Sequence, residues 1–129
     1  MVEKFEKILE KIKSEKGPLT FFGIFKMDEL TDKWSVLLSA TWASEHSKRI
    51  EAFEYLLDLL RKNLTSEEAR SIARIGVFSN DEHLIDLLLN FQKGSRIREQ
   101  SINGNIIHDG YVLEANRIVE SEIVPIPDY

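Results

Sequence analysis

The chain of 129 residues has no cysteine, only three prolines and six scattered glycines. Without cysteine it can form no disulfide scaffold, no thiolate zinc site and no cysteine nucleophile. Because the glycines are dispersed, no phosphate-binding glycine-rich loop is present, and the sequence signatures of zinc proteases, serine hydrolases and kinases are absent as well. The sequence therefore gives no catalytic motif, implies no cofactor and leaves open whether the protein is an enzyme.

Long apolar runs are also missing. The longest is a few residues, far below the ~20 needed to cross a bilayer. Residues 1–15 alternate acids and bases, whereas a secretory signal needs an unbroken apolar stretch. We therefore expect a soluble, cytoplasmic protein that makes no membrane contact.

Basic residues are fewer than acidic ones, with 17 Lys and Arg against 22 Asp and Glu. This balance is unusual for a duplex-DNA binder. The acidic excess lies in residues 79–129, so a partner steered by charge is expected to be cationic and to meet the C-terminal part of the molecule. The local basic group of Lys93, Arg96 and Arg98 has no interleaved aromatic residue, so we do not expect a nucleic-acid partner.

The apolar content of 43% and the length are typical of one packed domain, here residues 1–129. Residues 120–129 contain two prolines, which favour an extended C-terminal tail. The spacing of apolar residues predicts helices over residues 2–14, 44–64 and 79–91, a short turn at 65–68, and strands over residues 20–27, 34–42, 72–78, 96–102 and 105–118.

This order predicts an α+β (or α/β) domain with a mixed sheet and the element order α-β-β-α-β-α-β-β. Helices packed mainly on one face give two layers, and a three-layer sandwich is the alternative. Strands 34–42 and 72–78 are expected to run parallel, joined by one right-handed β-α-β crossover. In the intervening helix, we expect one buried stripe, made of Ile50, Phe53, Leu56, Leu57 and Leu60.

Polar residues follow both parallel strands, where ligands usually bind in α/β sheets. One interpretation is a site for a small ligand or a divalent metal, with His46 and His83 as ligands or proton-transfer groups. The alternative is that Ser44 and Ser79 cap the two helices and the histidines are simply exposed. No metal-ligand set is assigned. The candidate ligand-binding residues at this edge are Trp42, Ser44, Glu45, His46, Ser79, Asn80, Asp81 and His83.

Two further positions carry structural signals. Gly110, after His108 and Asp109, indicates a bulge or a close backbone approach within a bulged edge strand. Arg74 interrupts an apolar strand. It could hold an anionic ligand, but we expect it to form an ion pair with a neighbouring Asp or Glu or to occupy an exposed edge position, because an unpaired buried charge is costly.

The absence of catalytic motifs and the small size favour a non-enzymatic protein-interaction or regulatory module. The edge of the last hairpin could pair with a partner strand, and the chain could self-associate as a homodimer. Two alternatives remain open. One is a small enzyme or ligand- or metal-binding protein that uses the polar edge, and the other is a nucleic-acid accessory protein that uses Lys93, Arg96 and Arg98.

Overall fold

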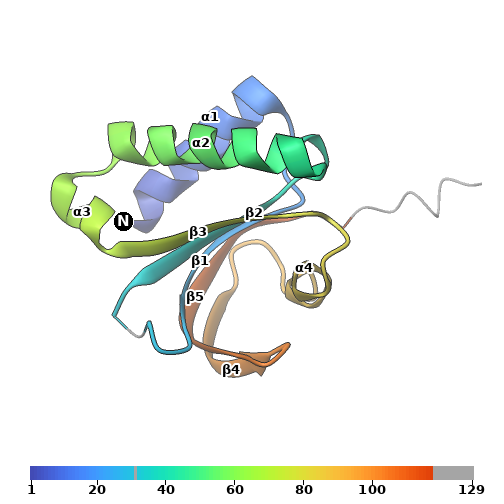
Figure 1. Ribbon diagram of the computed structural model, residues 1–129. Coiled ribbons are helices and arrows are strands. Elements are labelled where there is room, and N and C mark those ends of the chain that lie inside the picture. The colour runs from blue at the N-terminus through green and yellow to red at the C-terminus, as the bar shows by residue number, and fades with distance from the viewer. Residues whose placement is uncertain (31, 118–129) are drawn as a thin grey trace, which may run out of the picture.

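A computed structural model describes residues 1–30 and 32–117, so the tail predicted at 120–129 lies outside the described residues. Among the described residues, five strands form one mixed sheet in the order β3-β2-β1-β5-β4, in which β2 and β3 pair in parallel and the other neighbours pair antiparallel (Figure 1). The α+β class and the expected parallel pair are confirmed. The elements are α1 (Val2–Lys16), β1 (Phe21–Met27), β2 (Trp34–Ser39), a 3-10 turn (Thr41–Ala43), α2 (His46–Asn63), α3 (Ser66–Arg70), β3 (Ile72–Phe78), α4 (His83–Leu88), β4 (Arg96–Ile102) and β5 (Asn105–Ala115).

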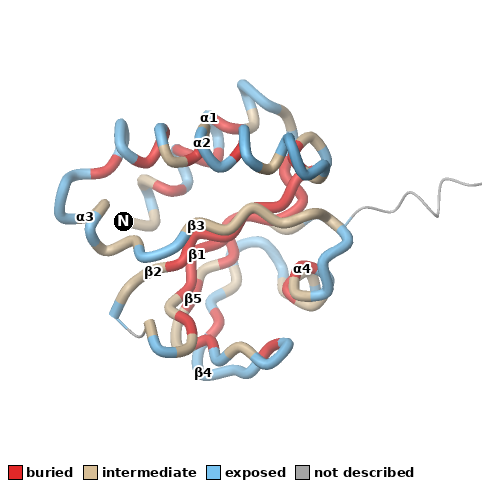
Figure 2. Tube along the Cα trace, in the orientation of Figure 1, coloured by how far each residue is buried: buried red, intermediate tan, exposed pale blue. Residues whose placement is uncertain are grey.

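The two faces of the sheet carry separate apolar cores. Helices α1 and α2 lie side by side on one face (Figure 1), where Phe5 of α1 and Leu56 of α2 belong to one buried core with Phe22 and Leu38 of the sheet. Helix α4 and the curled hairpin of β4 and β5 cover the opposite face (Figure 1). Strand β1 is shared by both cores, and its residues are almost all buried (Figure 2). The two long helices therefore share one face, as predicted, and the short α4 takes the other.

Strand β5 has a bulge at His108, because Lys26 pairs with Asp109 while the next residue, Met27, pairs with Ile107. The bulge was predicted, but β5 lies between β1 and β4 and is not an edge strand. The close backbone approach is also confirmed. A Cβ added at Gly110 would lie 2.2 Å from the Phe25 ring, so glycine is required for this ring to lie across the neighbouring strand.

The short helix α3 begins with a reciprocal capping box, as the spacing of Thr65 and Glu68 predicts. The Glu68 backbone N–H donates to the Thr65 hydroxyl, and the Glu68 carboxylate accepts from the Thr65 N–H. Lys4 of α1 donates to the same carboxylate at 2.6 Å. Glu68 therefore links the start of α3 to α1.

We expect Glu68→Gln to destabilise the protein in a pH-dependent way. Lys4 and the Thr65 amide lower the pKa of the Glu68 carboxyl to about 2, from an ordinary value of 4.5. A lowered pKa stabilises the fold above pH 4.5, and this contribution is lost as the pH falls toward 2. Urea unfolding of both proteins at pH 7 and near pH 2 measures the effect. A difference that does not shrink at low pH would contradict the assigned role of the charge.

Candidate functional site

The polar edge predicted from the sequence forms, but its residues bind one another. The Ser39 hydroxyl, which is fully buried, donates to the Asn80 Oδ1 at 2.7 Å. The Asn80 amide nitrogen Nδ2 donates to the Thr41 hydroxyl, and the Asn80 backbone N–H donates to the Ser44 hydroxyl. Ser44 in turn donates to the carbonyl of Ala40. These bonds join the ends of β2 and β3.

The expected serine caps are wrong in both helices. Helix α2 begins after Glu45 and α4 after Glu82, and neither start has a side-chain cap. Ser44 is occupied by the bonds to Ala40 and Asn80, while Ser79 donates to the Asp81 carboxylate at 2.6 Å. The hydroxyls therefore close the loops between strand and helix instead of capping the helices.

The remaining candidate residues do not gather around a shared centre. Trp42 lies in the 3-10 turn, beyond the end of β2 that was predicted to reach it, and donates from Nε1 to the Pro18 carbonyl at 3.0 Å. Its role is to join the start of α2 to the end of α1. His46, Glu45 and His83 are exposed, and Arg49 is the polar neighbour of the His46 ring, at 3.5 Å from Nδ1. Within residues 1–30 and 32–117, no three histidine or carboxylate side chains are placed to hold a metal ion.

The basic group of the last hairpin is engaged by carboxylates. Arg96 makes a bidentate contact with Asp109 at 3.0 Å to each oxygen, and Arg98 lies 4.0 Å from the same carboxylate. The Arg96 hydrogen bonds hold the pKa of Asp109 below its usual value. Lys93 lies 3.4 Å from the Glu114 carboxylate. Arg96 is therefore paired closely, whereas Arg98 and Lys93 remain largely exposed and share their carboxylates with Arg96 and Lys13.

The two outer strands of the sheet, β3 and β4, differ in the number of charged side chains that they carry. Strand β4 carries three charged side chains, and Glu99 at its centre has a positive φ of 47°. Charges of this kind protect an edge from pairing with another chain. Strand β3 has the sequence IARIGVF, with Arg74 as its one charged residue. Among the described residues neither β3 nor β4 pairs on its outer side, and β3, whose register against β2 shifts once between Ile72 and Arg74, is the edge with fewer charges.

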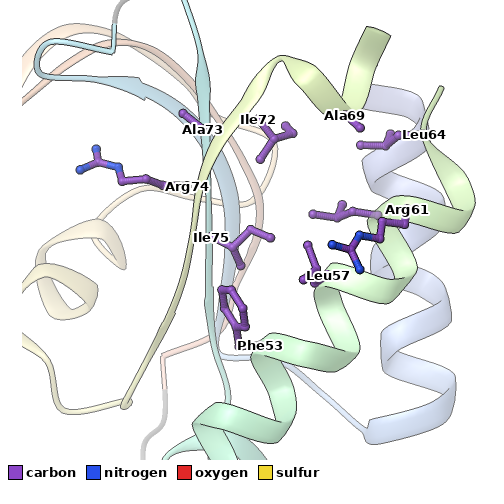
Figure 3. Close-up of a pocket in the computed structure, with 10 residues that line it drawn as sticks. Phe53, Leu57, Arg61, Leu64, Ala69, Ile72, Ala73, Arg74 and Ile75 are labelled. Carbon is purple, nitrogen blue, oxygen red and sulfur yellow. The ribbon is translucent and has the colours of Figure 1, made fainter. Parts of the chain in front are cut away.

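A groove with an apolar floor lies between β3 and α2. One of its cavities is about 330 Å³, and the side chains of Phe53, Leu57, Ile72 and Ile75 project into the space between strand and helix (Figure 3). Small residues, Ala69 and Ala73, also line it and leave the space unfilled.

The groove exists because α2 carries more apolar side chains than its packing buries. The buried set is Ala52, Leu56, Leu59 and Leu60, whereas Ile50 and Phe53 are 53% and 39% exposed. The predicted buried stripe of Ile50, Phe53, Leu56, Leu57 and Leu60 is therefore wrong for Ile50 and Phe53, which are exposed, and Leu57 is only half-buried. The apolar set of α2 is wider than the single stripe that a helix needs to pack against a sheet. This width was the feature of the sequence that could have indicated that some of these side chains remain exposed.

The groove continues along the whole edge of β3. A second cavity of about 190 Å³ is lined by Ile50 and Val77, and a third of about 500 Å³ is lined by residues from both sides of the strand, with Phe53 and Ile75 on the α2 side and Phe78 and Leu84 on the opposite side. Phe53 lines all three cavities. An extended segment lying along β3 would therefore meet the apolar groove on one face of the sheet, and Arg74 beside Phe78 and Leu84 on the other.

Comparison with protein-family models, curated proteins and solved structures gives no match for this chain. Among the described residues, no helix combines the length and the hydropathy that a bilayer crossing requires.

Proposed function

We propose that the protein is a protein-interaction module that binds an extended segment of a partner along β3. The observation that carries the proposal is the open, weakly charged edge of β3 beside the groove with Phe53 in its wall. Main-chain hydrogen bonds to the free edge would supply affinity, and pockets for alternate side chains would supply selectivity. Both the free edge and the groove are needed, because an exposed strand edge without side-chain pockets gives no selectivity among partners.

The proposed edge is β3, whereas the sequence favoured the edge of the last hairpin. The last hairpin offers β4, whose Arg96, Arg98 and Glu99 are typical of a protected edge. Strand β3 is mostly apolar instead, and the exposed side chains of Ile50 and Phe53 continue its apolar surface onto α2. Clustered exposed apolar side chains on a small domain are typical of interaction sites.

A ligand or catalytic site at the polar edge has weaker support. The hydroxyl and amide groups of Ser39, Ser44 and Asn80 are already hydrogen-bonded to one another or to Thr41 and Ala40. A ligand would have to replace bonds that hold β2 and β3 together. We therefore assign these residues to the framework of the fold.

Phage-displayed peptides selected on the immobilised full chain test this function. We expect selected peptides to shift the ¹⁵N-HSQC signals of β3 and of the α2 residues around Phe53. Phe53→Asp should weaken binding at least tenfold, because it places a charge in the apolar wall, and should change stability by less than about 1 kcal/mol, because the ring is partly exposed.

Ile106→Asp is the matched control, since Ile106 is an apolar side chain of β5 that is 49% exposed and does not line the three cavities. It should leave binding unchanged. Selected peptides that shift the signals of β4 or of the polar edge in place of β3 would overturn the proposal.

A further inference from the structure

We infer that the segment bound along β3 is acidic, with carboxylates alternating with apolar side chains; this inference rests on the function proposed above. A strand directs successive side chains to opposite faces. Alongside β3, one face meets the apolar groove of Phe53, Leu57 and Ile75, and the other meets Arg74 (Figure 3). An alternating pattern of apolar and acidic residues matches both faces at once.

Arg74 is placed to receive a carboxylate. It leaves β3 on the side away from α2, and its Nε donates to the Ser35 hydroxyl at 3.2 Å (Figure 3). No carboxylate of the described residues forms an ion pair with it, in contrast to Arg96 and Arg117. The guanidinium therefore keeps donors for a group on a neighbouring strand, where opposite charges across a pair stabilise the pairing.

The charged residues that line the groove are basic, whereas the chain as a whole has a net negative charge. The residues that line its three cavities include Arg49, Arg61 and Arg74 and no carboxylate. This is unexpected in a chain with five more acids than bases. The local field along β3 should therefore attract an anionic segment and repel a cationic one. The cationic partner expected from the acidity of residues 79–129 would have to use another surface.

A second copy of the chain fits this edge less well. Antiparallel pairing of two copies of β3 about Ile75 would place Arg74 opposite Gly76 of the other copy. Both arginines would then lie on one face as diagonal neighbours, roughly 7–8 Å apart. Like charges at this spacing are unfavourable, and neither copy brings a carboxylate among the lining residues to offset them. We therefore assign the edge to a different, acidic segment.

The test uses a synthetic peptide, acetyl-Ser-Ile-Glu-Val-Glu-Ile-Glu-Val-Ser-amide, and its counterpart with glutamine at the three glutamate positions. Both are titrated into the ¹⁵N-labelled full chain. We expect the glutamate peptide to bind about tenfold more tightly at low salt, with a smaller difference at high salt. The variant with Arg61→Gln and Arg74→Gln should remove the difference. Arg98→Gln on the charged β4 edge is the matched control and should preserve it.

Residues 118–129 also combine apolar residues with Glu120, Glu122 and Asp128, so the titrations are repeated on the full chain with Glu120→Gln, Glu122→Gln and Asp128→Asn. Tighter binding of the glutamate peptide in either protein supports the inference. Equal binding of both peptides, with shifts still in β3, overturns the acidic preference and leaves the proposed function standing. No shift in β3 or α2 with either peptide in either protein overturns the proposed function itself.

Discussion

Gly110→Ala is expected to lower the free energy of unfolding by about 2–3 kcal/mol, a large cost for one added methyl group. The new Cβ would lie 2.2 Å from Cδ1 of Phe25, a distance that real Cβ atoms do not adopt. The ring has little room to move, because Phe25 is fully buried and stacks on Phe21 at a centroid separation of 6.0 Å. Gly23 also limits the movement of the Phe25 ring, since a Cβ at Gly23 would lie 2.7 Å from the ring.

Urea unfolding of Gly110→Ala, with Gly104→Ala as the control, measures this effect. Gly104 lies in the turn before β5 with a φ of 79° and open space around it, so its alanine variant should lose only about 1 kcal/mol from backbone strain. Phe25→Leu should relieve the clash, and the double variant Phe25→Leu/Gly110→Ala should lose less than the sum of the single variants. Additive losses would contradict a direct contact between ring and glycine.

The double variant Lys13→Met/Lys93→Met is expected to lose about 2 kcal/mol near pH 7, because it leaves a buried carboxylate without a partner. Glu114 of β5 is 4% exposed, and its oxygens lie 3.2 Å from Lys13 Nζ and 3.4 Å from Lys93 Nζ. Glu114 also raises the pKa of Lys13 above its ordinary value of 10.5. The contribution of Lys13 is therefore fully present below pH 10.5 and is lost as the pH rises above it.

Adding Glu114→Gln to the double variant should restore most of the lost stability, because the buried charge is removed. Chemical unfolding at pH 7 compares the two proteins. Lys62→Met serves as the surface control, since Lys62 pairs with Asp58 where both side chains are exposed, and it should leave stability nearly unchanged. A triple variant no more stable than the double would show that the lysines act through packing and not through charge.

Much of the fold could be predicted because its signals are local. The alternation of Trp34, Val36 and Leu38 marks β2, and the spacing of Thr65 and Glu68 marks the start of α3. The parallel pairing of β2 with β3 followed from the helix between them. Gly110 was singled out correctly, although only the three-dimensional structure identifies the ring of Phe25 as its neighbour.

The proposed interaction edge was harder to predict because it depends on which strands end the sheet. The last hairpin does supply one edge, β4, as the sequence indicated, but only the strand order shows that β3 is the other edge. The role of Ser44 was also hidden, because its partner Asn80 is 36 positions away. The exposure of Phe53 depends on how α2 is rotated against the sheet, which the spacing of apolar residues does not determine when the apolar set is wide.

Hydrogen–deuterium exchange of the full chain, with and without a saturating selected peptide, tests the central claim that β3 is the interaction edge. A paired strand protects amides that were open to water, so we expect slower exchange at the outward-facing amides of β3, with β4 unchanged. Exchange in β3 that does not slow while the peptide is bound would contradict the account.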